Sequence, residues 1–123
     1  MSDFDWKEYL TFAKALFKCH ESLGVCLPTI HRNAISRAYY AAHNRARQWY
    51  GEQQQVTDLP HNQKLIDALY DTGTAGKKMA KYLHDLKLWR GRADYDTSVR
   101  SLEMKTHSLL KLAQNVLDLA DRN

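Results

Sequence analysis

Apolar residues recur at intervals of three and four along most of the chain, which is the spacing of one face of an α-helix. The first such stripe runs through Trp6, Leu10, Ala13 and Phe17. No segment alternates apolar and polar residues as a half-buried strand does, and only two prolines and five glycines interrupt the pattern. The sequence therefore predicts an all-α fold.

Breaks in the apolar stripes divide the chain into four main helices and one short helix. The expected helices span about 3–21, 28–50, 61–71, 75–90 and 97–120. Gly51 is expected to end the second helix, and the GRADYD stretch at 91–96 is expected to interrupt the fourth. No internal repeat and no long linker occurs, so we expect residues 1–123 to form a single helical bundle.

The composition is that of an ordinary globular chain, with 44% hydrophobic and 26% charged residues among 123. No apolar run approaches the roughly 20 residues of a membrane span, and the first residues are acidic and polar rather than signal-like. We therefore expect a cytoplasmic protein with no membrane partner. Cys19 and Cys26 are too few for a disulfide framework or a metal quartet, and the histidines lack metal-ligand spacing. No metal and no other cofactor is predicted.

The net charge of +4 is concentrated in one segment, from residue 31 to residue 51. This segment contains four arginines and no acid, while the remaining fourteen bases and fourteen acids cancel. The arginines are Arg32, Arg37, Arg45 and Arg47. Such clustering indicates a phosphate-bearing partner, and the alternative is an ordinary solvated helix face.

The same segment has two different faces when it is projected as a helix. One side carries small and apolar residues, namely Ala34, Ala38, Ala41, Ala42, Ala46 and Trp49. The other side carries polar groups, namely Ser36, Arg37, Tyr40, His43, Asn44 and Arg47. Because small residues let a neighbouring backbone approach closely, we expect this helix to be the central one. Arg45 projects toward the apolar side and is expected to pair with an acid.

The aromatic residues fall into two groups. Trp6, Trp49, Trp89 and Tyr39 lie on or near apolar stripes and are predicted to be core residues. Tyr40 projects among the arginines, where it is either a rim residue or a ring on which a base stacks. His43 is expected to have a surface or interface role.

A second unusual segment, at residues 90–96, gathers charged and hydroxyl groups where two helices meet. It contains Arg90, Arg92, Asp94, Tyr95 and Asp96. In one interpretation Asp94 or Asp96 caps the last helix and Arg90 pairs with an acid. In the other, an arginine held by a neighbouring aspartate faces a phosphate, and Tyr95 donates a hydroxyl.

The two segments together resemble the HEPN domain family, and more narrowly its small stand-alone prokaryotic branch. The strings that carry the resemblance are SRAYYAAH at 36–43 and R-x-x-A-D-Y-D at 90–96. Helix order and motif spacing extend the resemblance from about residue 6 to residue 120, and His61 falls where the family often has a histidine. The resemblance implies a helical bundle that forms a two-fold dimer. Many family members are metal-independent RNA endonucleases, often toxins or components of defence systems.

The family's catalytic signature is an arginine followed four to six residues later by a histidine. The RNA 2′-hydroxyl attacks the adjacent phosphate, the histidine moves the proton, and the arginine stabilises the developing charge. The resemblance places Arg90 at the family arginine and Tyr95 at the histidine's position, with Asp94 able to accept a proton or orient Arg90. Gly91 replaces the polar residue of active members. Since a tyrosine has a pKa near 10, the substitution favours binding over cleavage.

Three functions are compatible with these residues. The first is an RNA-binding HEPN-like domain of a toxin–antitoxin or defence system, with RNA or a nucleotide as its partner. The second is an active metal-independent endoribonuclease that uses Arg90, Asp94 and Tyr95. The third is a non-catalytic homodimer that partners a nucleotidyltransferase-like antitoxin. The residues expected to bind nucleic acid are Arg37, Tyr40, Asn44, Arg47 and Arg92.

Overall fold

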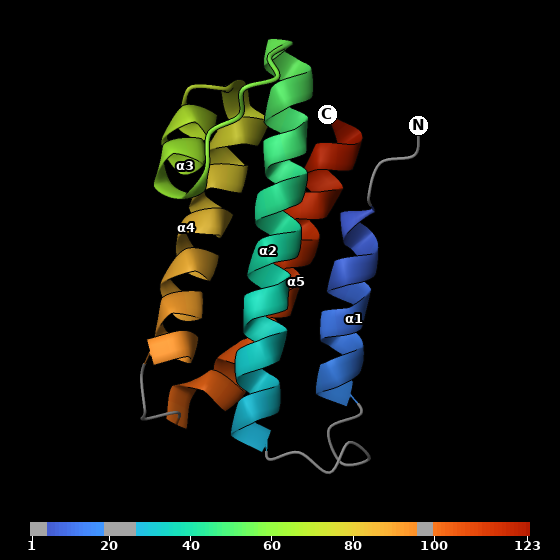
Figure 1. Ribbon diagram of the computed structural model, residues 1–123, viewed down its shortest axis with the longest axis vertical. Helices are drawn as coiled ribbons and strands as arrows, with labels where there is room; N and C mark the ends of the chain where they lie inside the picture. Colours follow the sequence, from blue (N-terminus) through green and yellow to red (C-terminus); the bar gives the residue numbers. More distant parts are fainter. Residues whose placement is uncertain (1–4, 19–26, 96–99) are drawn as a thin grey trace.

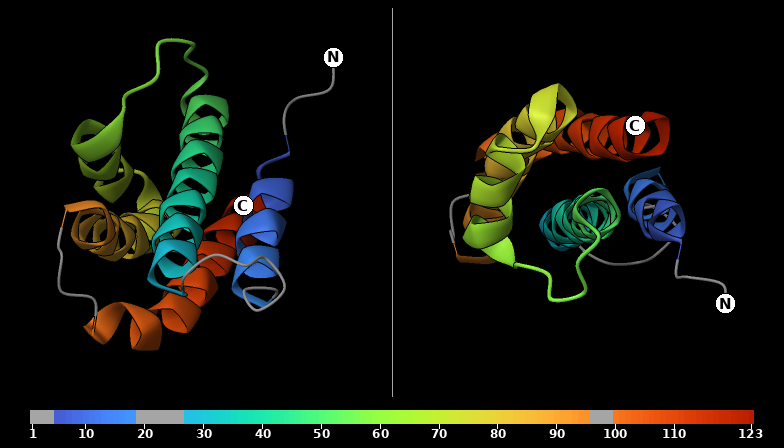
Figure 2. Two further views of the ribbon diagram at one scale, coloured as in Figure 1. Left: turned by 60° about the horizontal axis from the view of Figure 1, so that its bottom comes forward. Right: turned by 90° about the horizontal axis from the view of Figure 1, so that it is seen from above.

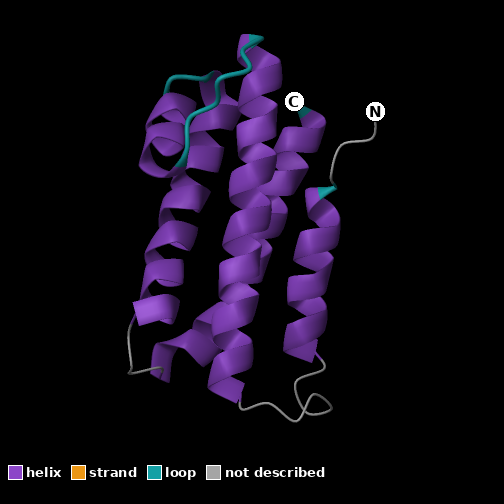
Figure 3. Ribbon diagram, in the orientation of Figure 1, coloured by secondary structure: helices purple, strands orange, loops and turns teal. Residues whose placement is uncertain are grey.

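The structure is a computed structural model that describes residues 5–18, 27–95 and 100–123. Its helices are α1 (Trp6–Lys18), α2 (Leu27–Gln54), α3 (Asn62–Tyr70), α4 (Gly73–Tyr95) and α5 (Arg100–Arg122). Within these ranges every regular element is a helix and no strand occurs, which confirms the predicted all-α class (Figure 3). None of the described helices combines the length and apolarity needed to cross a bilayer.

Helix α2 is the centre of the bundle, as its alanine-rich face predicts. It contacts α1, α3, α4 and α5, and Figure 1 shows it with α1 on one side and α4 on the other. Ala34, Ala38, Ala41, Ala42 and Ala46 are all fully buried. Small side chains at these positions let three long helices approach α2 closely, so a larger residue there would cost about 1–3 kcal/mol in overpacking.

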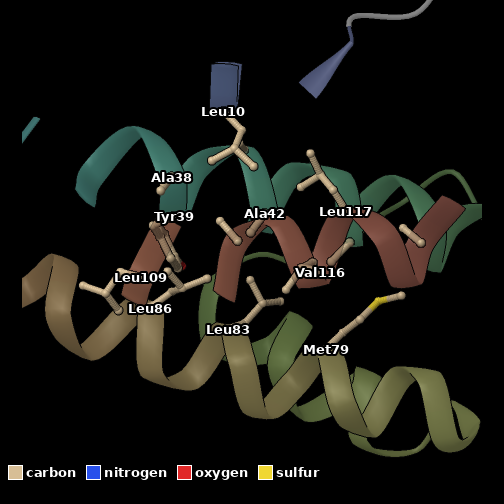
Figure 4. Packing of buried hydrophobic residues seen from close by; sticks show 14 of the residues in the cluster. Leu10, Ala38, Tyr39, Ala42, Met79, Leu83, Leu86, Leu109, Val116 and Leu117 are labelled. Carbon is tan, nitrogen blue, oxygen red and sulfur yellow. The ribbon is translucent and has the colours of Figure 1, made fainter. Parts of the chain in front are cut away.

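The core lies where α2, α4 and α5 meet. Figure 4 shows the Tyr39 ring pointing from α2 toward Leu86 of α4 and Leu109 of α5, and all three are at most 2% exposed. Trp49 is also buried, so the predictions for Tyr39 and Trp49 are confirmed. Trp6 and Trp89 are only half-buried, at the edges of the bundle.

Gly51 does not end α2, and that prediction was wrong. The helix continues to Gln54, and the chain turns at Gln55, whose φ of 56° is left-handed. A Cβ added at Gly51 would lie 2.8 Å from the Leu59 side chain. A side chain at this position would therefore have to displace the end of the Leu59 side chain, because the loop after α2 folds back against the helix.

Helix α4 was expected to be interrupted by the stretch at 91–96, but it runs through Gly91 to Tyr95, and Asp96 lies outside the described residues. Among the described residues, no atom of another part of the chain lies within 4 Å of a Cβ built at Gly91, so this glycine serves no close approach to them. Ala93, two residues later, is fully buried, and its carbonyl oxygen accepts a hydrogen bond from Arg32 of α2. Tertiary packing of this last turn outweighs the roughly 1 kcal/mol that a glycine costs inside a helix.

Arg45 pairs with acids, as predicted. Its Nη2 lies 3.2 Å from Asp121 Oδ1, and its Nη1 lies 3.4 Å from Glu52 Oε1. Lys7 Nζ of α1 also lies 2.6 Å from Asp121 Oδ2. One carboxylate of α5 therefore links α1 and α2. The hydrogen bond from Lys7 is the main reason that the pKa of Asp121 is lowered, and the Arg45 guanidinium adds to it.

Candidate nucleic-acid interface

Arg90 of α4 and Tyr40 of α2 are in direct contact, although fifty residues separate them in the chain. Arg90 Nη2 donates a hydrogen bond of 2.8 Å to the Tyr40 hydroxyl oxygen. The guanidinium carbon also lies 4.9 Å from the centre of the Tyr40 ring and 5.4 Å from the centre of the Tyr39 ring. Two aromatic rings and a hydroxyl therefore fix the orientation of one guanidinium group.

The two tyrosines differ sharply in exposure. Tyr40 is 38% exposed, whereas Tyr39 is fully buried. Burial raises the pKa of the Tyr39 phenol, and the nearby Arg90 charge partly opposes that rise. The Tyr39 hydroxyl has no hydrogen-bond partner among the described residues. Tyr39 is thus a core ring beneath Arg90, and Tyr40 is the one that reaches the surface.

Four polar residues of α2 lie along one side of the helix at intervals of three and four. They are Arg37, Tyr40, Asn44 and Arg47, hereafter the α2 row. The row extends for about 15 Å, at 1.5 Å per residue. All four were predicted to bind nucleic acid, and none is buried. Their individual contacts, however, differ.

Arg37 faces α1 rather than α4. Its guanidinium carbon lies 4.7 Å from the centre of the Phe12 ring and 5.7 Å from the centre of the Tyr9 ring. Phe12 is 48% exposed, so this stack lies at the surface. Arg37 and Arg90 therefore make similar aromatic contacts on opposite flanks of α2.

Arg47 holds the loop that joins α2 to α3. Its Nε donates to the Pro60 carbonyl at 3.0 Å, and its Nη2 donates to the Leu59 carbonyl at 3.2 Å. Nη2 also lies 2.9 Å from His61 Nε2. Because arginine carries only donors, His61 Nε2 must be the acceptor, so that nitrogen is unprotonated in this arrangement. Arg47 thus fixes the loop by three contacts.

Asn44 and Arg92 make local contacts. The Asn44 side-chain amide donates to the Tyr40 backbone carbonyl one turn earlier, at 2.9 Å. Arg92 lies over the Trp89 ring at 4.7 Å, and Lys105 of α5 reaches the same ring at 5.4 Å. Of the predicted set, the structure brings Arg90 to Tyr40 and leaves Arg37, Arg47 and Arg92 with other partners.

Asp94 and Tyr95 belong to the last turn of α4, but their side chains lie outside the described residues, as does all of Asp96. The catalytic roles expected for Asp94 and Tyr95 therefore stay predictions.

His43 was expected at a surface or an interface, and that prediction was wrong. It is only 4% exposed, and its Nε2 accepts a 3.0 Å hydrogen bond from the Asn62 backbone amide at the start of α3. Burial is the main reason that its pKa is lowered to about 4. His43 is consequently neutral at pH 7 and anchors α3 to α2.

Sequence reasoning missed one partner that the structure adds to the candidate interface and misplaced one residue. Phe12 supports Arg37, and its apolar side chain gave no indication of exposure. The buried position of His43 was detectable, because His43 follows Tyr39 by one helical turn and shares its side of α2. The ring centres of the two residues are 5.5 Å apart.

Asn44 and Arg47 also line a hollow of about 500 Å³ beside the α2 row, together with Trp6, Gln48 and Glu52. Within the described ranges, no group of three or more histidine, cysteine, aspartate or glutamate residues could hold a metal ion. The chain matches no family model, no curated protein and no solved structure in the comparisons made.

Proposed function

We propose that this protein is a HEPN-like RNA-binding domain and that single-stranded RNA binds along the α2 row, with Arg90 beside it. The contact between Arg90 and Tyr40 is the observation that carries the proposal. It joins the two segments that resemble the HEPN family and presents a guanidinium next to an exposed aromatic ring. Phosphate and base are the two groups that such a pair recognises.

The orientation of Arg90 supports phosphate binding. A guanidinium held against two rings has already lost part of its side-chain freedom, so less entropy is lost when it binds a phosphate. Two of the four arginines in residues 31–51, Arg37 and Arg47, belong to the α2 row, whereas Arg45 is ion-paired with Glu52 and Asp121. An anionic backbone following the α2 row would meet a guanidinium group at each end of it.

Two histidines close to the α2 row, His43 and His61, favour binding over cleavage. His43 is buried and neutral, and its Nε2 is already bonded to the Asn62 amide. His61 Nε2 accepts a hydrogen bond from Arg47. A general base has to reach the 2′-hydroxyl of RNA, and neither Nε2 is available for that role in this arrangement.

The test is fluorescence anisotropy of a labelled single-stranded RNA titrated with the protein at several salt concentrations. The logarithm of the association constant should fall with the logarithm of salt, at about 0.7 per phosphate contacted. Arg90→Ala should weaken binding roughly tenfold, the scale of one charged hydrogen bond. Arg122→Ala removes the same charge at the end of α5 and should change affinity little. If the two variants lose equal RNA affinity, the loss reflects net charge alone, which would contradict the proposed site.

The resemblance also suggests that the RNA-binding unit is a two-fold dimer in a toxin–antitoxin or defence system. Light scattering over a range of protein concentrations tests the dimer. A monomeric mass at every concentration would remove this part of the proposal and leave RNA binding to stand separately.

A further inference from the structure

A second recess lies between α1 and α5, away from the α2 row. Both helices pack on α2 but have few contacts with each other, and Figure 2 shows them side by side next to α2. The recess has a volume of about 530 Å³. Its described lining consists of Thr11, Lys14, Ala15, Phe17 and Lys18 of α1 and His107, Leu110, Lys111 and Gln114 of α5.

Contacts between α1 and α5 cross the recess at two places. Lys14 Nζ donates a 2.7 Å hydrogen bond to Gln114 Oε1. Further along, the Phe17 and His107 rings lie with their centres 6.4 Å apart. Both helices also pack on α2, which sets their spacing, so the space between them is preformed rather than opened by a ligand.

The lining combines an apolar wall with positive charge. Leu110 is buried and Phe17 half-buried, and the methylene stems of the lysines add to the apolar surface. Lys14, Lys18 and Lys111 contribute ammonium groups, and no carboxylate occurs among the described residues that line the recess. The complementary ligand has an apolar body and an anionic head.

We infer that the recess binds a single-chain organic anion of medium length, such as an acyl carboxylate of about eight carbons. The acyl chain lies against Leu110, Phe17 and Ala15, and the carboxylate lies between the ammonium groups of Lys18 and Lys111. From Thr11 to Lys18 the α1 wall measures about 10 Å, which limits the length of chain that can be covered.

A small ligand fits this recess better than a helix of a partner protein does. A helix lying along the groove would have to displace both the Lys14–Gln114 hydrogen bond and the Phe17–His107 contact. The volume also falls within the range of about 300–1,000 Å³ that is usual for small-molecule sites.

Isothermal titration calorimetry with octanoate, octanol and octyltrimethylammonium separates the contributions of chain and charge. Octanoate should bind with one site per chain and more tightly than the neutral or cationic analogue. Hexanoate should bind about fifteenfold more weakly, because each buried methylene changes affinity by about fourfold. Equal binding of octanoate and octanol, or no binding of octanoate below its micelle-forming concentration, would overturn the inference.

Two variants test the location. Lys18→Gln with Lys111→Gln keeps most of the stems and removes both charges, and should weaken octanoate binding at least tenfold. Lys77→Gln with Lys81→Gln removes equal charge from exposed positions of α4 and is the matched control. Ala15→Trp fills the recess from an exposed position and should abolish binding, with circular dichroism confirming the fold.

Other kinds of ligand in the recess would give different outcomes in these experiments. An acidic amphipathic peptide that binds where octanoate does not would assign the recess to a protein partner and overturn the inference. Protein self-association that Ala15→Trp abolishes would assign it to a second copy of the chain. RNA affinity should be the same in Ala15→Trp and wild type, so failure here would not affect the RNA-binding proposal.

Discussion

Tyr40 and Arg90 link the arginine-rich central helix α2 to the last turns of α4. The 2.8 Å hydrogen bond from Arg90 Nη2 to the Tyr40 hydroxyl ties α4 to α2, and the Tyr39 ring supports the guanidinium from the core. The Tyr40–Arg90 contact should therefore have two separable effects. One is on the free energy of unfolding, and the other is on the affinity of Arg90 for an anion.

Tyr40→Phe separates these effects. The variant keeps the ring beside Arg90 and removes the acceptor of its hydrogen bond, so the free energy of unfolding should fall by about 0.5–1.5 kcal/mol. RNA affinity should fall by a few-fold, because Arg90 is less firmly oriented while the base-stacking ring remains. Chemical denaturation and fluorescence anisotropy measure the two quantities.

Tyr70→Phe is the matched control for that substitution, since Tyr70 is also 38% exposed but lies on α3. It should leave stability and RNA affinity unchanged. If Tyr40→Phe behaves like Tyr70→Phe in both assays, the hydrogen bond with Arg90 has no measurable role in solution.

Tyr39→Phe, unlike Tyr40→Phe, should not lower the free energy of unfolding. The Tyr39 hydroxyl is buried and has no hydrogen-bond partner among the described residues, and leaving such a group unpaired costs about 1–3 kcal/mol. Removing it should leave the protein equally stable or raise the free energy of unfolding by about 1 kcal/mol. Thermal denaturation followed by circular dichroism measures the change, and a clear loss of stability would show that the hydroxyl is paired in solution.

The fold could be predicted well because helix formation and burial follow from local spacing. The alanines of α2 identify the central helix without knowledge of its neighbours, and each one is buried as expected. The helix ends at Gly51 and Gly91 were mispredicted because tertiary contacts decide them. Leu59 folds back onto Gly51, and the buried Ala93 keeps the chain helical beyond Gly91.

The candidate site was only partly predictable for a related reason. Sequence spacing places Tyr40 and Arg47 on one side of α2, but it does not say which groups from other helices meet them. Arg90 reaches Tyr40, whereas Arg47 bonds the carbonyls of a loop that follows its own helix. A helical projection assigns a side to each residue, and only the packing of helices assigns its partner.

Arg47→Ala should loosen the loop from residue 55 to residue 61. The substitution removes donors to the Leu59 and Pro60 carbonyls and the contact with His61. Amide hydrogen exchange should become faster in this loop and at the start of α3, and the free energy of unfolding should fall by about 1–2 kcal/mol. Exchange in α5 should rise only by the factor that follows from the fall in the global free energy of unfolding.

Arg47→Lys distinguishes a loop-holding role from a phosphate-binding role. A lysine keeps the charge but cannot reproduce the several fixed N–H directions of a guanidinium. If Arg47 mainly holds the loop, the amide hydrogens of the loop should exchange nearly as fast in Arg47→Lys as in Arg47→Ala. If the loop amides of Arg47→Ala exchange as slowly as in wild type while RNA binding is weakened, Arg47 contacts RNA directly instead.

His43 should make the stability of the protein depend on pH between about 6.5 and 4. Its pKa is lowered from 6.5 to about 4 in the folded protein, mainly by burial. In this range the unfolded chain binds a proton that the folded chain does not, so the free energy of unfolding falls as the pH falls. At about 1.4 kcal/mol per pKa unit, the loss approaches about 3 kcal/mol at pH 4.

His43→Gln tests this dependence, because the glutamine amide has an oxygen that can accept the hydrogen bond from Asn62 and does not titrate. Urea denaturation at a series of pH values should show a shallower loss of stability for His43→Gln than for wild type. His84→Gln replaces an exposed histidine of α4 and should keep the wild-type dependence.

Asp121 also stabilises the fold less as the pH falls, because Lys7 lowers its pKa. Asp121 is present in all three proteins, so its contribution cancels in the comparison. Parallel curves for wild type and His43→Gln would mean that His43 accepts a proton in the folded protein as readily as in the unfolded chain, and that the imidazole is more accessible to water than its 4% exposure implies.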